Sequence, residues 1–295
     1  MHSAEQGAVL PLVDSHCHAW DYWPYDPPVP DPMTRGKIEQ LIWEMDQSGV
    51  ARACVVAANI ELNPDNNCYV ADAVARYPDR LHHIAHIDCA WEATYNAPGA
   101  ADRLARLCDT FDPVGVTRYF DAKVDERILS DEGLAFFAVA QERRLLMSIS
   151  AGPAWHGQIA EIARRFPEMP ILLHHIGAFH ADGMTRDAAF AAMLPAITQP
   201  NVHVKLSGFH YGAERFWDFP QHDTIAFVER LFDAVGARRM CWGSDYPVGR
   251  RDRGFTYPQT IECIRHHCVF LPAEDVPLVL GGTLDQLLRS REKPL

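Results

Sequence analysis

Short apolar runs alternate along the chain with longer segments whose apolar residues recur at helical spacing. Eight apolar runs predict β-strands at residues 12–18, 51–58, 81–88, 114–120, 145–150, 171–175, 202–207 and 239–243. Helical spacing predicts helices at residues 37–49, 66–77, 100–108, 133–144, 158–166, 188–198, 225–235, 257–267 and 275–289. Strands that are apolar on both faces are typical of parallel sheets covered by helices. The alternation runs through residues 1–295 without a change of composition. It predicts a single-domain α/β protein with a (β/α)8 TIM barrel.

One segment fits neither pattern. Residues 21–32 contain five prolines together with Trp23 and Tyr25, and this density of proline rules out a helix or a central strand. The segment directly follows the first predicted strand. Two interpretations stay open for it: an aromatic loop that covers a site, or a rigid surface loop.

The overall charge narrows the class of partner. The formal net charge is −12, and no long basic run is present, so nucleic acid and anionic membrane surfaces are not expected as partners. No apolar run reaches the roughly 18 residues that a membrane span needs. The eight cysteines are scattered, and no signal peptide is recognisable. Both features favour a reducing cytoplasm.

Two histidines mark the end of the first predicted strand. His16 and His18 are two residues apart, and residues at this spacing point to the same face of a strand. Two imidazoles that converge on one point can share a metal ion or contact one substrate. The alternative is a pair of surface histidines.

Further titratable residues stand where other strands end. The carboxyl ends of the strands carry the catalytic groups of barrel enzymes, and here His175 follows the sixth strand and Asp245 the eighth. Asp245 is suited to act as a general base on water or as a metal ligand. His16, His18 and His175 are suited to polarise a carbonyl group or to orient that water. The alternative for Asp245 is a turn aspartate before the Tyr-Pro pair.

Basic and hydroxyl side chains at the same ends are candidates for binding the substrate. Arg118, at the end of the fourth strand, offers a planar fork for a carboxylate, and Lys205, on the seventh, offers a charge for an oxyanion. An ion pair within the barrel mouth is the alternative for both. Tyr211 and Arg215, beyond the seventh strand, are further candidates. These residues predict a small-molecule partner that is anionic or polyhydroxylated.

Other residues near the strand ends are assigned differently. His174 alternates with His175 and is therefore expected to pack between strand and helix. His86, at the end of the third strand, fits the site and the core equally well. The arginines at positions 250, 251 and 253 follow Asp245. They could attract an anionic substrate, although solvated loop arginines are commoner.

Four motifs at strand ends resemble those of the amidohydrolase superfamily. They are His16-Cys17-His18, His175-Ile176-Gly177, Lys205-Leu206-Ser207-Gly208 and Gly243-Ser244-Asp245-Tyr246-Pro247. The resemblance spans residues 12–288 and is closest to the amidohydrolase 2 branch. That branch holds sugar-acid lactonases, pyrone-dicarboxylate lactonase and sulfomuconolactone hydrolase. The resemblance implies a (β/α)8 barrel in which Asp245 activates water and the histidines line the site.

Two departures from the family pattern concern the metal. Metal-dependent members usually carry a histidine after the fifth strand, where this chain has Ser148 and Ser150. The fourth strand ends in Arg118, where two-metal members carry a bridging lysine or glutamate. The resemblance therefore argues against a two-metal site. Either no metal is required, as in the pyrone-dicarboxylate member, or one divalent ion, zinc or manganese, is held by His16, His18 and Asp245.

Three functions are compatible with these observations. The first is hydrolysis of a lactone of a small sugar acid or of a di- or tricarboxylic acid, with Asp245 as general base. The second is metal-dependent decarboxylation of an aromatic or muconate-type acid, and the missing strand-five histidine counts against it. The third is a barrel that binds a ligand without turnover, which the polar cluster disfavours. The oligomeric state is open, and a homo-oligomer is compatible with the sequence.

Overall fold

The strands pair in the order in which they occur along the chain. The computed structural model describes residues 10–26, 28–215, 217–247 and 256–292. Its eight parallel strands form one sheet. They are β1 (Leu12–Cys17), β2 (Val50–Val56), β3 (Leu81–His86), β4 (Gly115–Tyr119), β5 (Leu146–Ser150), β6 (Ile171–Leu173), β7 (Val202–Leu206) and β8 (Met240–Trp242). Every predicted strand is present, with ends that differ by a residue or two.

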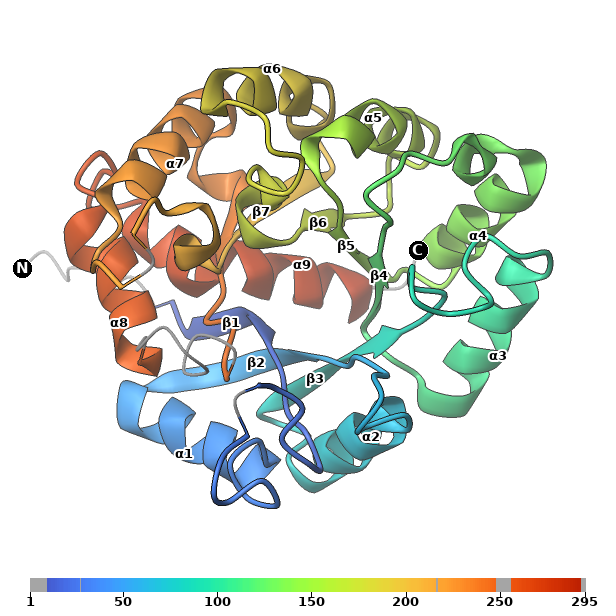
Figure 1. Cartoon of the computed structure of the whole chain (residues 1–295), viewed down its shortest axis with the longest axis horizontal. Helices are drawn as coiled ribbons and strands as arrows, with labels where there is room; N and C mark the ends of the chain where they lie inside the picture. The colour runs from blue at the N-terminus through green and yellow to red at the C-terminus, as the bar shows by residue number, and fades with distance from the viewer. Residues whose placement is uncertain (1–9, 27, 216, 248–255, 293–295) are drawn as a thin grey trace, which may run out of the picture.

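Helices surround the strands as a ring (Figure 1). They are α1 (Ile38–Ser48), α2 (Asn66–Arg76), α3 (Ala100–Phe111), α4 (Asp131–Glu142), α5 (His156–Arg165), α6 (Arg186–Ile197), α7 (His222–Val235), α8 (Tyr257–Glu262) and α9 (Thr283–Glu292). Each strand buries one face inside the barrel and the other under this ring, which explains why the strands are apolar on both faces. The predicted (β/α)8 TIM barrel is confirmed.

An apolar layer fills one end of the barrel. Leu284 and Leu288 of α9 pack against inward-pointing side chains of the strands: Val13, Cys54, Val56, Ile84, Leu146, Leu172 and Cys241. α9 runs across the barrel at this end (Figure 1). Because this end is packed, the polar side chains gather at the opposite end, where the strands finish.

The last helix begins later than the sequence predicts. A helix was expected over residues 275–289, but α9 starts at Thr283 and is preceded by a π-helical turn, Leu278–Gly282. Gly281 lies in this turn, and a Cβ there would be 2.0 Å from the carbonyl oxygen of Pro11. The chain therefore passes the start of β1 too closely for any side chain.

No helix among the described residues is long and apolar enough to cross a membrane. The cytoplasmic location and the single domain over residues 1–295 stay predictions.

We expect Gly281→Ala to lower the free energy of unfolding, because the new methyl group would overlap the backbone of Pro11 and Val13. Overpacking of this kind costs about 1–3 kcal/mol. The matched control is Gly157→Ala in α5, where a Cβ meets no atom within 4 Å and alanine favours the helix. Urea denaturation of both variants measures the effect, and equal stability of the two would contradict it.

Candidate active site

The barrel closes where the end of β1 pairs with the chain that follows β8. The Asp245 amide donates to the His16 carbonyl oxygen at 2.7 Å, and the His18 amide donates to the Tyr246 carbonyl oxygen at 2.6 Å. These bonds bring the Asp245 carboxylate to both histidines. Its Oδ1 lies 3.6 Å from Nε2 of His16 and 3.8 Å from Nε2 of His18. The structure thus brings together three of the residues selected from the sequence.

A buried aspartate ties the two sides of this closure together. Asp14 accepts hydrogen bonds on Oδ1 from the amides of His16, at 2.9 Å, and Ser244, at 3.0 Å. Its Oδ2 accepts from the hydroxyls of Ser244, at 2.5 Å, and Tyr257, at 2.8 Å. Burial raises the pKa of Asp14, and these four bonds oppose the rise. The only sequence signal for this role is a charged residue inside an apolar run, which sequence analysis did not single out.

Both histidines that follow β6 face the site. Leu172 points into the barrel, and His174, two residues further along the chain, points the same way. The ring centroid of His174 lies 4.4 Å from that of His16. The backbone then turns, with positive φ at residues 175–178, and this turn brings His175 back, 4.7 Å from His16 between ring centroids. The prediction that His174 packs between strand and helix is therefore wrong, because Leu172 and His174 both point into the barrel and the backbone leaves the extended conformation only at His175.

A hydrogen-bonded polar layer adjoins the histidines inside the barrel. Lys205 of β7 donates to Ser148 Oγ at 2.7 Å and lies 3.3 Å from Nδ1 of His16. Ser148 Oγ is 2.6 Å from Nε2 of His174, and Thr117 Oγ1 is 3.5 Å from the same nitrogen. Lys205 is therefore directed at its protein neighbours, and its contact with a substrate oxyanion stays a prediction.

Burial determines the charge states of the cluster. Desolvation lowers the pKa of His16, His174 and His175 well below 6.5, so these rings are neutral at neutral pH. It lowers the pKa of Lys205 to about 8 and raises the pKa of Asp245 to about 8. The nearby Tyr211 hydroxyl and the Lys205 charge oppose the rise at Asp245.

The donor atoms of His16, His18 and Asp245 fit one divalent cation. They lie within 4.8 Å of one another. Nε2 of His16 and both carboxylate oxygens of Asp245 have no hydrogen-bond partner among the described residues. Nδ1 of His18 is 2.7 Å from the Val56 carbonyl oxygen, so Nδ1 carries the proton and Nε2 presents its lone pair. Two imidazoles and a carboxylate leave an open position on a zinc ion.

Aromatic side chains complete the surroundings of the histidines. Trp20 stacks on His18 with ring centroids 5.5 Å apart, and Tyr25 of the proline-rich loop packs edge-on against Trp20 at 5.9 Å. The loop thus lies against the site, which favours the first of its two interpretations. Tyr211 packs against His175 at 4.9 Å. Tyr119 of β4, to which sequence analysis gave no role, packs against His174 with ring centroids 5.2 Å apart.

Arg118 does not join this cluster. Its neighbours in β4, Thr117 and Tyr119, contact His174 inside the barrel. The intervening Arg118 therefore points outward, where its Cζ lies 4.7 Å from the ring centroid of Phe136 in α4. The sequence does not reveal this, because all three of these residues carry polar groups.

The remaining candidates also lie apart or outside the described chain. The Arg215 side chain is 70% exposed and pairs with Asp218 at 3.8 Å. His86 is buried, and its Nε2 lies 3.1 Å from a carboxylate oxygen of Glu92. The arginines at 250, 251 and 253 lie outside the described residues.

A closed (β/α)8 barrel with histidines and an aspartate at the carboxyl ends of its strands is the arrangement in which barrel enzymes build their active sites. The amidohydrolase family model matches residues 13–288. The chain therefore belongs to the amidohydrolase family and is a hydrolase. It is similar to the L-fucono-1,5-lactonase of Burkholderia ambifaria, with 28% identity over 261 residues that cover 81% of each chain.

Two solved structures share the fold at low sequence identity. One is an amidohydrolase from Burkholderia multivorans with bound zinc, at a TM-score of 0.73 and 18% identity, covering 95% of this chain and 99% of that one. The other is a probable 2-pyrone-4,6-dicarboxylic acid hydrolase from Acinetobacter baumannii with citric acid bound. Its TM-score is 0.71 at 17% identity, with 94% of this chain and 99% of that one covered.

The raised pKa of Asp245 predicts a pH-dependent difference in stability between the wild type and Asp245→Asn after chelation. Between the ordinary carboxyl pKa of 3.8 and the buried value of about 8, the native state keeps a proton that the unfolded chain has lost. The wild-type free energy of unfolding therefore falls relative to the variant as pH rises through this window, and levels off above it. Urea denaturation at about pH 5, 7 and 9 tests this. A difference that does not change with pH would contradict it.

Proposed function

We propose that the chain hydrolyses a lactone of a small sugar acid, with Asp245 as the general base. One observation carries this proposal. A buried carboxylate, neither oxygen of which has a hydrogen-bond partner within 3.5 Å in the described part of the chain, lies beside His16 and His18 at the carboxyl end of the barrel. The named activity of the L-fucono-1,5-lactonase relative supports the reaction class.

Asp245 is suited to take a proton from water. A base works best when its pKa lies near the working pH, and burial raises the pKa of Asp245 to about 8. In the proposed reaction, Asp245 accepts a proton while the water oxygen attacks the lactone carbonyl carbon. The ring C–O bond then breaks, Asp245 returns the proton to the departing ring oxygen, and the hydroxy acid leaves.

The neutral histidines are suited to stabilise the oxyanion that precedes ring opening. In the site without a metal ion, a charged Lys205, 3.3 Å from Nδ1 of His16, makes that nitrogen an acceptor, so Nε2 carries the proton and can donate to the oxyanion. His175 lies beside it, with Nδ1 3.1 Å from Ser207 Oγ. Its remaining nitrogen is a second candidate donor toward the carbonyl oxygen.

A divalent ion, zinc or manganese, would be held by His16, His18 and Asp245 and would supply Lewis acidity toward the lactone carbonyl. The base and the hydrogen-bond donors described above belong to the protein itself. Both possibilities for the cofactor, one ion or no required metal, stay in the proposal.

The surroundings of the site favour a polyhydroxylated substrate over one with several carboxylates. Arg118 and Arg215 do not reach the cluster, and among the described residues Lys205 is the cation directed at it. The hydroxyl-bearing rings of Tyr119 and Tyr211 pack against its histidines. Such groups hydrogen-bond sugar hydroxyls, which favours a sugar-acid lactone.

We expect Asp245→Asn to lower kcat for lactone opening by about 10²–10⁴-fold, the usual contribution of a general base. Hydrolysis of a panel of sugar-acid 1,4- and 1,5-lactones measures the effect, with circular dichroism as a check of folding. The matched control is Asp218→Asn, whose carboxylate is 54% exposed and should leave kcat unchanged.

Full activity of Asp245→Asn would contradict the assignment of the base. Release of CO2 from an aromatic or muconate-type acid, with no lactone turned over, would replace the proposal by the decarboxylase alternative.

A further inference from the structure

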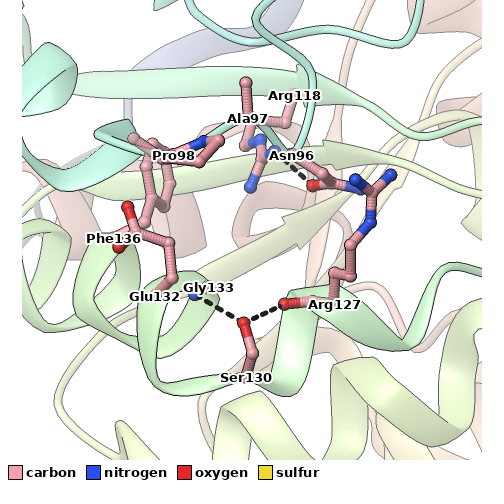
Figure 2. A pocket seen from close by; sticks show the side chains of 10 residues that line it. Asn96, Ala97, Pro98, Arg118, Arg127, Ser130, Glu132, Gly133 and Phe136 are labelled. Atoms are coloured by element: carbon pink, nitrogen blue, oxygen red, sulfur yellow. Dashed lines mark hydrogen bonds between the residues drawn. The ribbon is translucent and has the colours of Figure 1, made fainter.

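A cavity lies outside the barrel, between the loop that precedes α3, the end of β4 and the start of α4. Its volume is about 210 Å³, and Figure 2 shows the side chains around it. Much of its lining is apolar and comes from Ala97, Pro98, Ala100 and Phe136. The polar lining residues are Asn96, Arg118, Arg127, Ser130 and Glu132.

Arg118 is a buried cation that lacks a counter-ion. It is 2% exposed, and no described carboxylate lies within 4.0 Å of its nitrogens. Its Nη2 donates to Asn96 Oδ1 at 3.1 Å and its Nε to the Asp88 carbonyl oxygen at 3.4 Å. Within the described part of the chain no hydrogen bond is made by the other amino group, Nη1, and Figure 2 shows a guanidinium nitrogen directed into the cavity.

The neighbouring charges are already paired or occupied. The Asp88 carboxylate accepts three hydrogen bonds from Arg103, at 2.9, 3.2 and 2.8 Å, and Arg127 is paired with Asp125 at 2.6 Å. The Glu132 carboxylate lines the cavity and accepts from the Gly99 amide at 2.7 Å, and it forms no ion pair with Arg118 within 4.0 Å. Among the described residues, Arg118 therefore has no ion-pair partner. The rings of Tyr95, Phe120 and Phe136 lie within 6 Å of its Cζ and offset part of the cost of burying the guanidinium. A negative partner would offset the rest, so an anion is the ligand that suits this arrangement.

We propose that this cavity binds a small aromatic monocarboxylate, with the carboxylate on the free edge of Arg118. The apolar residues and the Phe136 ring suit an aromatic body, and the guanidinium fork suits a carboxylate. The volume is below the roughly 300–1,000 Å³ of sites for drug-sized ligands, so a single ring fits. Glu132 lines the cavity and disfavours a second carboxylate.

This site is distinct from the Asp245 cluster. Arg118 and Tyr119 are adjacent in β4 and point to opposite sides of the sheet, Tyr119 toward His174 and Arg118 toward Phe136. Binding in the cavity therefore does not require the barrel site, and the two can be removed separately by mutation.

Isothermal titration calorimetry with benzoate, and with benzamide as the neutral analogue, tests the proposal. The wild type should bind benzoate at least tenfold more tightly than benzamide. Arg118→Met should weaken benzoate binding at least tenfold. Arg143→Met is the matched control, because Arg143 lies at the C-terminal end of α4 and pairs with Asp109, and it should not change the binding. Asp245→Asn should bind benzoate as the wild type does.

A second variant covers the case in which Arg118→Met does not fold. Ala97→Phe places a ring in the cavity that Ala97 lines while keeping the Arg118 side chain, and should also abolish benzoate binding. The proposal is overturned if the wild type does not prefer benzoate, or if Ala97→Phe binds it normally. Loss of binding in Asp245→Asn would place the benzoate in the barrel site and would equally overturn it. None of these outcomes depends on lactone turnover.

Discussion

The closure of the barrel between β1 and the chain after β8 is the constraint on which the site depends. Two backbone hydrogen bonds, Asp245 to His16 and His18 to Tyr246, form this closure and also set the separation of the carboxylate from the imidazoles. Asp14 holds both sides through four hydrogen bonds. Fold and site are therefore coupled, since a barrel that closed in another register would separate the base from the histidines.

Burial then converts this geometry into chemistry. The same desolvation that lowers the pKa values of His16, His174 and His175 raises the pKa of Asp245. The result is a set of neutral rings beside a carboxyl group that can gain and lose a proton near neutral pH. Nε2 of His16 and the carboxylate oxygens of Asp245 have no hydrogen-bond partner among the residues that the structure describes. A water molecule, a substrate oxygen or one divalent ion can satisfy them.

The sequence predicts the barrel well because each strand is an apolar run that ends in polar residues. His16, His18, His175 and Asp245 are found at strand ends for the same reason, and the structure brings them together. Sequence reasoning fails where a side chain's direction depends on local backbone conformation. The turn that begins at His175 brings this residue to the same site as His174. The run Thr117, Arg118, Tyr119 gives no sign of which residue faces inward.

The most direct test of the account is to open L-fucono-1,5-lactone with the wild-type protein in H2¹⁸O and to locate the label by mass spectrometry. Attack of water on the carbonyl carbon predicts catalysed turnover above the spontaneous rate, with one ¹⁸O in the product carboxylate and none in the released hydroxyl. Absence of catalysed turnover with this lactone and related sugar-acid lactones, or label in the hydroxyl group, would contradict it.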